Sequence, residues 1–140
     1  MAWQFTSRAP VYLQIVSRIR ADILGGVYKP DEQIPSVRQL ALTAGVNPNT
    51  MQRAFAVLED EQLFITRGTV GRFITTDTEA LTHAREILHR ETVARLIDEA
   101  AAVGLTPDEL IEGIRAYGNK SASLISNSEP PASTNATRKE

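Results

Sequence analysis

Polar side chains share one face of the segment 48–61, immediately after a short turn. At about 100° per residue in an α-helix, Gln52 and Arg53 lie within about 60° of Asn49. Asn and Gln can pair bidentately with adenine, and Arg can pair with guanine, at the base edges in the major groove. The first two turns of this face carry no Asp, Glu or Lys. The pattern therefore predicts a helix that contacts DNA bases.

Two further groups of side chains are placed to contact the DNA backbone. Ser36 and Arg38 begin the preceding predicted helix, where a helix N-terminus and a guanidinium suit phosphate groups. Arg67 and Arg72 flank a predicted hairpin tip that could reach the neighbouring groove or the backbone. The sequence leaves open whether these two hairpin arginines contact DNA or only keep the surface soluble.

A first helix is predicted over residues 10–24, because apolar side chains recur there every three or four positions. Arg18, Arg20 and Asp22 lie away from the centre of that apolar stripe. Residues 27–35 contain two prolines and form a bounded connection, since proline excludes a regular helix. Upstream of the helix, the two aromatic residues of segment 3–5 cover either the core or a dimer seam.

A tight turn between two helices follows this connection. Ser36 and Gln39 have the spacing of a capping box, which predicts the start of the second helix. Gly45 suits a left-handed residue at its end. Asn47 is expected to serve as the N-cap of a third helix, with Pro48 at its first position. A turn this short can set the two helices at a steep angle.

A change of period predicts a small β-hairpin after the third helix. Residues 63–66 and 72–75 are strand-like, and residues 67–71 supply two glycines for the turn. The acidic run 59–61 is expected to be a solvated helix end. The predicted fold class is mainly α with a small β-hairpin: a winged helix-turn-helix head followed by two C-terminal helices that form a dimerisation region.

Several stretches of the head resemble the GntR family of bacterial transcription regulators. They are Pro-Val-Tyr-Leu-Gln-Ile at 10–15, Ile-Pro-Ser-Val-Arg-Gln-Leu-Ala at 34–41, Gly-Val-Asn-Pro-Asn-Thr-Met-Gln-Arg-Ala-Phe at 45–55, and Thr-Arg-Gly at 66–68. The similarity covers about half of the chain, residues 9–76. In the wing, one glycine is shifted from the family's usual pattern.

The resemblance implies a set of DNA contacts and an oligomeric state. Arg38 is the family's contact in the second helix, and Gly68 and Gly71 belong to the wing. The C-terminal helices resemble the YtrA subfamily, whose members are homodimeric. The full set of expected DNA-binding residues is Ser36, Arg38, Pro48, Asn49, Thr50, Gln52, Arg53, Arg67, Gly68, Gly71 and Arg72.

The C-terminal half has the composition of an interface rather than of a DNA-binding surface. Residues 1–76 hold eight basic and six acidic side chains, whereas residues 77–140 hold seven basic and eleven acidic ones. We divide the chain into a DNA-binding domain at 9–76, a helical dimerisation region at 77–126 and a disordered tail at 127–140. The expected dimer contacts are Leu88, Leu96, Ile97, Leu110, Ile111, Ile114 and Tyr117.

Composition and motifs argue against several other functions. The chain of 140 residues has no cysteine, and neither a membrane-length apolar run nor the apolar core of a signal peptide, so we expect a cytoplasmic protein. No catalytic motif is found, and we expect neither an enzyme nor a cofactor. His83, Glu86 and His89 spread over about 120° of a helix, too wide for one metal ion.

The sequence therefore predicts a transcriptional regulator, expected to be a repressor, that binds a palindromic double-stranded DNA operator as a homodimer. The alternative is a winged-helix protein-interaction module that does not bind DNA. The presence of a small-molecule effector stays open. An effector would bind at the dimer interface or at the junction with the head, and would change the spacing of the two heads.

Overall fold

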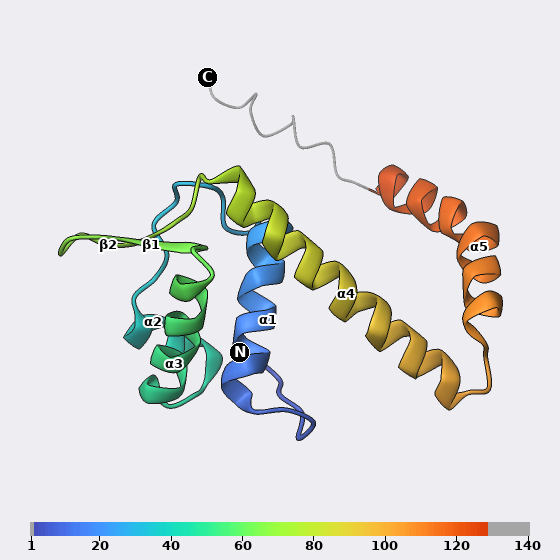
Figure 1. Ribbon diagram of the computed structural model, residues 1–140, viewed down its shortest axis with the longest axis horizontal. Helices are drawn as coiled ribbons and strands as arrows, with labels where there is room; N and C mark the ends of the chain where they lie inside the picture. Colours follow the sequence, from blue (N-terminus) through green and yellow to red (C-terminus); the bar gives the residue numbers. More distant parts are fainter. Residues whose placement is uncertain (1, 129–140) are drawn as a thin grey trace. The chain divides into compact units, whose positions relative to one another are not determined.

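The computed structural model describes residues 2–128 and the side chains of residues 2–118 (Figure 1). The chain forms two compact units, which we call the head (Met1–Thr92) and the C-terminal unit, which begins at Val93. The described elements are α1 (Val11–Leu24), α2 (Val37–Ala44), α3 (Pro48–Asp60), β1 (Phe64–Arg67), β2 (Gly71–Ile74), α4 (Thr78–Ala102) and α5 (Pro107–Ser128).

The core of the head is built where α1, α2 and α3 meet. Ile15 and Ile19 of α1 and Met51 of α3 are fully buried, at the helical spacing that the sequence predicts. Phe55 of α3 meets Phe64 of β1 edge to face, with ring centroids 5.0 Å apart. Ala84 of α4 packs into the same core, and for this reason the head extends beyond the predicted boundary at residue 76.

The predicted helix-turn-helix signals are confirmed one by one. The Ser36 hydroxyl accepts a hydrogen bond from the Gln39 amide at 3.1 Å, and the Gln39 side chain accepts one from the Ser36 amide at 3.1 Å. Gly45 is left-handed, with φ 76°. The Asn47 side chain accepts a hydrogen bond from the Asn49 amide at 2.7 Å. These caps fix a three-residue turn between α2 and α3.

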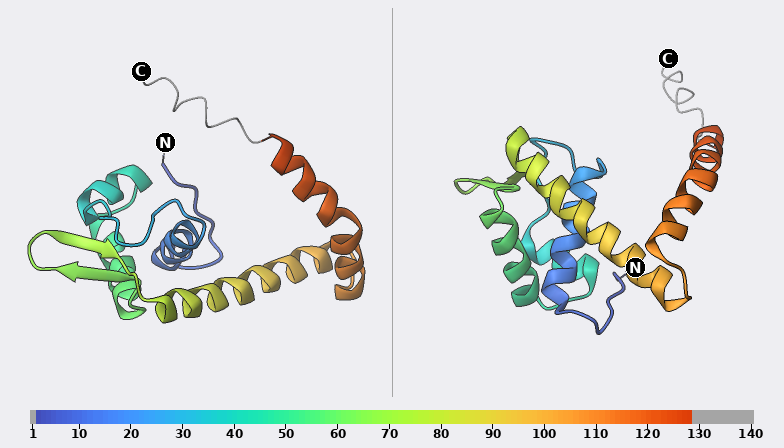
Figure 2. Two further views of the ribbon diagram at one scale, coloured as in Figure 1. Left: turned by 90° about the horizontal axis from the view of Figure 1, so that it is seen from above. Right: turned by 45° about the vertical axis from the view of Figure 1, so that its right-hand side comes forward.

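The hairpin is the predicted one, shifted by one residue in each strand. Phe64 pairs with Ile74 and Arg67 with Gly71, so the turn is three residues long. This hairpin of β1 and β2, which we call the wing, projects from the helices of the head (Figure 2). Sequence reasoning missed that the connection before α2 lies against β2. Three backbone hydrogen bonds of 2.9 to 3.0 Å join residues 31–34 to β2 and hold the base of the wing.

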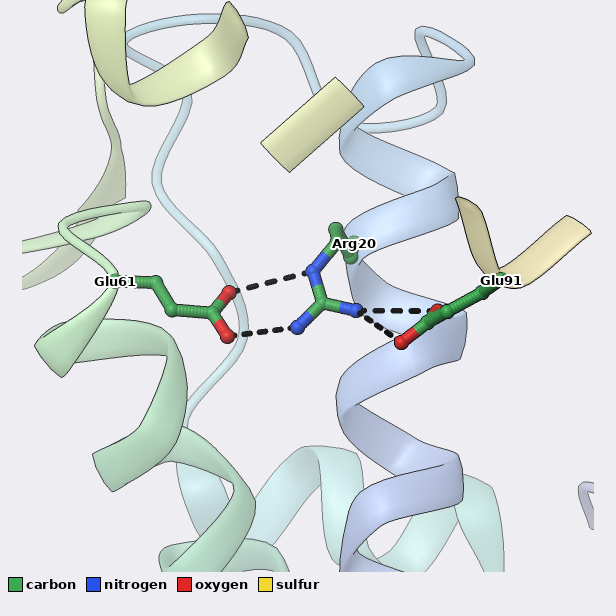
Figure 3. Close-up of polar contacts among 3 residues, drawn as sticks. All are labelled: Arg20, Glu61 and Glu91. Atoms are coloured by element: carbon green, nitrogen blue, oxygen red, sulfur yellow. Dashed lines mark hydrogen bonds and ion pairs between the residues drawn. The ribbon is translucent and has the colours of Figure 1, made fainter. Parts of the chain in front are cut away.

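A buried arginine joins three helices of the head. The sequence places Arg20 away from the centre of the α1 stripe, yet only 5% of its side chain is exposed. Its guanidinium lies 2.7 Å from Glu61, which caps α3, and 3.4 Å from Glu91 of α4 (Figure 3). Because a buried charge is costly without partners, this arginine ties the end of α3 and the middle of α4 to α1.

The C-terminal unit comprises the end of α4, a short connection and α5. Gly104 is left-handed and ends α4, and Thr106 and Glu109 form a second capping box at the start of α5. Eight large apolar residues of this unit are 37% to 74% exposed: Val93, Leu96, Ile97, Val103, Leu105, Ile111, Ile114 and Tyr117. Helix α5 runs to Ser128, and the remainder of the tail predicted at 127–140 lies outside the described residues.

We expect Arg20→Ala to lower the free energy of unfolding by about 2–3 kcal/mol. The loss stays below that of a fully buried pair, because 21% of the Glu61 side chain and 43% of the Glu91 side chain are exposed. Urea denaturation followed by circular dichroism measures the change. Arg90→Ala, at an exposed position of α4, is the control and should change the value by less than about 0.5 kcal/mol. Equal effects of the two substitutions would contradict the role of Arg20 in tying α3 and α4 to α1.

Candidate nucleic-acid interface

The outer face of α3 presents the side chains that the sequence predicts as base readers. Asn49, Gln52 and Arg53 are exposed, and Thr50 is half-buried. The Arg53 guanidinium stacks over the ring of Tyr12 in α1, with its central carbon 4.0 Å from the ring centroid. Sequence reasoning assigned Tyr12 only to the apolar stripe of the first helix. Stacking of this kind orients a guanidinium and leaves its N–H groups at the rim available to a ligand.

Arg38 in α2 provides a second exposed cation beside this face. It lines one hollow with Pro48, and Gly45 and Val46 of the turn complete the wall between them. Within the part of the chain whose side chains are described, neither Arg38 nor Arg53 has a carboxylate within ion-pair distance. Both guanidinium groups are therefore free to bind an anion such as a phosphate, or a guanine edge.

The wing lies close to the start of α2. Ser36 and Gln39 line a hollow of about 530 Å³ with Gly71 and Arg72 of β2. Ser36 is the N-cap of α2, and the N-terminal end of a helix favours anions. The structure thus brings together a predicted phosphate contact of α2 and two predicted wing residues that lie more than thirty positions away in the sequence.

Arg72 is fixed in place by α3. Its Nε atom donates a hydrogen bond of 2.6 Å to Glu59, and its guanidinium lies 5.2 Å from the ring centroid of Phe55. The Thr66 hydroxyl of β1 donates to the same Glu59 oxygen at 2.9 Å. Both strands of the wing are therefore attached to α3 through one carboxylate.

The electrostatics of Glu59 follow from these contacts. Burial alone raises the pKa of the Glu59 carboxyl, but the hydrogen bonds from Arg72 and Thr66, together with the charge of Arg72, outweigh burial. They hold the pKa below its ordinary value of 4.5. The expectation that the acidic run 59–61 is simply solvated is wrong at two of its three positions, since Glu59 fixes the wing and Glu61 binds Arg20.

Arg67 near the wing tip also has a carboxylate partner. It forms an ion pair with Asp31, and its guanidinium stacks over Phe73 at 4.3 Å. Gly68 has φ 51° and Gly71 φ 140°, two conformations that side chains rarely adopt. A methyl group on Gly71 would also lie 2.6 Å from the side-chain nitrogen of Gln33. Glycine therefore suits both positions, and a side chain at Gly71 would both strain the backbone and displace the side chain of Gln33.

The described part of the chain, residues 2–128, also bears on two other kinds of site. No cluster of three or more His, Cys, Asp and Glu side chains is placed to hold a metal ion there. His83 and His89 are both exposed on α4. In the same residues, no helix has the length and apolar character needed to cross a membrane.

Comparison with known proteins identifies the family of this chain. Residues 11–74 match the bacterial regulatory proteins of the gntR family. Over 114 residues, which are 81% of this chain and 94% of the relative, the sequence is 34% identical to the HTH-type transcriptional regulator YhcF of Bacillus subtilis. This chain belongs to the gntR family. The predicted winged helix-turn-helix fold and the predicted family are thereby confirmed.

Two further relatives of this gntR-family protein support the assignment. It is 32% identical to the HTH-type transcriptional repressor YtrA of Bacillus subtilis, over 78% of this chain and 85% of that one, which confirms the resemblance to YtrA. A GntR family transcriptional regulator from Listeria monocytogenes of known structure is 29% identical and superposes with a TM-score of 0.67. That alignment covers 80% of this chain and 98% of the other. The protein is a helix-turn-helix transcriptional regulator.

We expect the attachment of the wing through Glu59 to weaken in acid. Because the pKa of Glu59 is lowered in the folded protein, its contribution to stability is present above pH 4.5 and is lost as the pH falls through the lowered value. Glu59→Gln removes this contribution at every pH. The difference in unfolding free energy between wild type and variant should therefore be largest near pH 7 and shrink towards pH 3. A difference that grows on acidification, measured by urea denaturation, would contradict the assignment.

Proposed function

We propose that this protein is a sequence-specific DNA-binding repressor that binds a palindromic operator as a homodimer. The observation that carries the proposal is the outer face of α3, which follows a capped, three-residue turn. It presents three exposed groups able to pair with bases, and its one cation has no carboxylate partner among the described side chains. A recognition helix enters the major groove with its N-terminal residues against base edges. Asn49, Gln52 and Arg53 occupy that end of α3.

The arginines around this face are suited to different tasks. Arg38 and Arg53 are unpaired in the described residues and are the two we assign to DNA. Arg67 and Arg72 are held by Asp31 and Glu59, so they orient the wing first and reach DNA only at the cost of an ion pair. Ser36, Pro48, Thr50, Gly68 and Gly71 complete the proposed contact surface, as cap, turn and wing residues.

The proposed dimer rests on the C-terminal unit. Leu105, Leu110, Ile114 and Tyr117 line an apolar hollow of about 400 Å³ along α5. Burial of one exposed Leu or Ile side chain is worth about 1.5–3 kcal/mol, and several remain uncovered in the single chain. A second copy of the same unit would cover them. Leu96, Ile97 and Ile111, which the sequence also assigns to the interface, are exposed as well.

The remaining parts of the proposal follow from symmetry and from the relatives. A twofold dimer presents two copies of α3 and therefore fits a palindromic site. Repression is proposed because the Bacillus subtilis relative YtrA carries the name of a repressor. Binding of a small-molecule effector at the dimer interface or at its junction with the head remains a proposal. The residues of helix α3 expose no large apolar side chain, so the alternative of a protein-docking helix has no support there.

We expect Arg38→Ala and Arg53→Ala each to weaken operator binding by about 10-fold to 100-fold. Each substitution removes an exposed guanidinium without breaking an ion pair, so the fold and the dimer should be retained. Fluorescence anisotropy with promoter DNA of the protein's own operon, at fixed salt, measures affinity. Arg90→Ala is the control and should bind like wild type. Wild-type affinity in either test variant would show that the assigned surface is wrong.

We expect Ile114→Glu to convert the dimer to monomer. The position is 54% exposed in the single chain, so a carboxylate is tolerated there until a second copy covers it. Sedimentation equilibrium should show association weakened by at least about 100-fold, which corresponds to about 2.7 kcal/mol. Val27→Glu introduces the same charge at a 64% exposed position of the head and should leave the dimer intact. A dimer that survives Ile114→Glu would refute this interface.

A further inference from the structure

A segment without helix or strand, Ala2–Ala9, precedes α1, and we call it the strap. Trp3 and Phe5 are half-buried against the core of the head, while the residues between and beside them are exposed. The sequence left open whether these aromatics cover the core or a dimer seam, and the structure places them on the core. The strap lies outside residues 11–74, which match the family.

One end of the strap contacts the turn of the helix-turn-helix. The backbone amide of Trp3 donates a hydrogen bond of 3.1 Å to the carbonyl of Ala44. That carbonyl belongs to the last residue of α2 and has no partner within its own helix. Ala2 lies against Gly45 so closely that a methyl group on Gly45 would sit 2.9 Å from the Ala2 Cβ. The strap thus touches both residues that end α2.

The other end of the strap is fastened to α1. The Gln14 side chain accepts a hydrogen bond from the Thr6 amide at 3.0 Å and donates one to the Thr6 carbonyl at 2.8 Å. It donates another to the Ala9 carbonyl at 2.8 Å. One turn further along α1, the Arg18 guanidinium stacks over the Trp3 ring, 4.1 Å from its centroid. The position of α1 is therefore transmitted through the strap to the turn.

We propose that the strap positions the recognition helix for base readout, with Trp3 as its central positioning residue. This proposal rests on the proposed DNA-binding function of α3. Only three residues, Gly45 to Asn47, separate α2 from α3, so a restraint on Gly45 limits the angle at which α3 leaves the turn. Bidentate pairing with bases needs accurate placement, whereas flexible cations contact phosphates over a wider range. The strap therefore supports specificity more than general affinity.

The test compares Trp3→Ala with wild type, both as full chains, on two DNA duplexes of equal length at one salt concentration. One duplex carries the operator and the other an unrelated sequence. We expect the ratio of specific to non-specific affinity to fall about tenfold, with non-specific affinity changed less than about twofold. Trp3→Phe keeps a ring against Arg18 and should retain most of the ratio. An unchanged ratio in Trp3→Ala overturns the proposal.

Leu24→Ala separates positioning from a general loss of stability. Leu24 is a half-buried core residue at the opposite end of α1, far along the helix from the strap contacts. Its truncation removes apolar packing from the same core but leaves the strap in place. The affinity ratio should therefore stay at the wild-type value. If Leu24→Ala lowers the ratio as much as Trp3→Ala does, the role of the strap is only structural and the proposal fails.

Intrinsic fluorescence reports whether the strap is docked, because Trp3 is the only tryptophan of the chain. Gln14→Leu removes the three side-chain hydrogen bonds that hold the strap to α1 and leaves Trp3 present. We expect its emission to shift to longer wavelength and its affinity ratio to fall as in Trp3→Ala. A shifted emission with an unchanged ratio would overturn the proposal.

Amide exchange in the absence of DNA tests the restraint on the turn by itself. The amides of Gly45 and Val46 both donate to the Ala41 carbonyl, at 2.9 and 3.0 Å. We expect Trp3→Ala to speed hydrogen exchange at these two amides about tenfold. The exchange rate of the amide of buried Ile19 should stay unchanged. Unchanged exchange at the turn overturns the proposal. A wild-type protein that binds neither duplex would refute the proposed function, while the exchange result would still decide whether the strap restrains the turn.

Discussion

The head depends on one buried charge. Arg20 of α1 lies between the end of α3 and the middle of α4, and its guanidinium keeps its carboxylate partners only while Glu61 and Glu91 stay beside it. Apolar packing can slide at small cost, but a buried cation that loses a carboxylate bears the full penalty of desolvation. The ion pairs of Arg20 with Glu61 and Glu91 therefore hold the end of α3 in one position. The caps and the turn then set the beginning of α3, so both ends of this helix are fixed.

Carboxylates divide the arginines of α2, α3 and the wing into two groups. Glu59 and Asp31 hold Arg72 and Arg67, and through them the wing keeps a defined position against α3 and the connection before α2. Arg38 and Arg53 carry no such partner in the described part of the chain. This division explains how a chain with a net charge of −2 can present a DNA-binding surface. A few placed cations without a carboxylate partner, rather than a general positive excess, supply the positive charge of this surface.

Local signals in the sequence were sufficient to predict the helices and the two strands of the head. The capping box at Ser36, the left-handed Gly45 and the Asn47 cap each involve residues within four positions of one another, so their spacing alone determines them. The predicted bounds of each strand differ by one residue from those in the structure, because the glycines of the hairpin allow more than one turn length. The pairing of residues 31–34 with β2 was missed, since its partner lies about forty residues away.

The sequence by itself determined most of the helix boundaries and the apolar faces, because these depend on periodicity and on neighbours along the chain. It also predicts which side chains of α3 would contact bases. Tertiary structure decided the partners of the charged groups. Arg20, Glu59 and Glu61 look like ordinary surface residues in the sequence, and only the folded chain brings their opposite charges together across separations of more than ten residues. It also decided that the strap aromatics cover the head. Long-range pairing depends on which faces meet, and no local pattern encodes that.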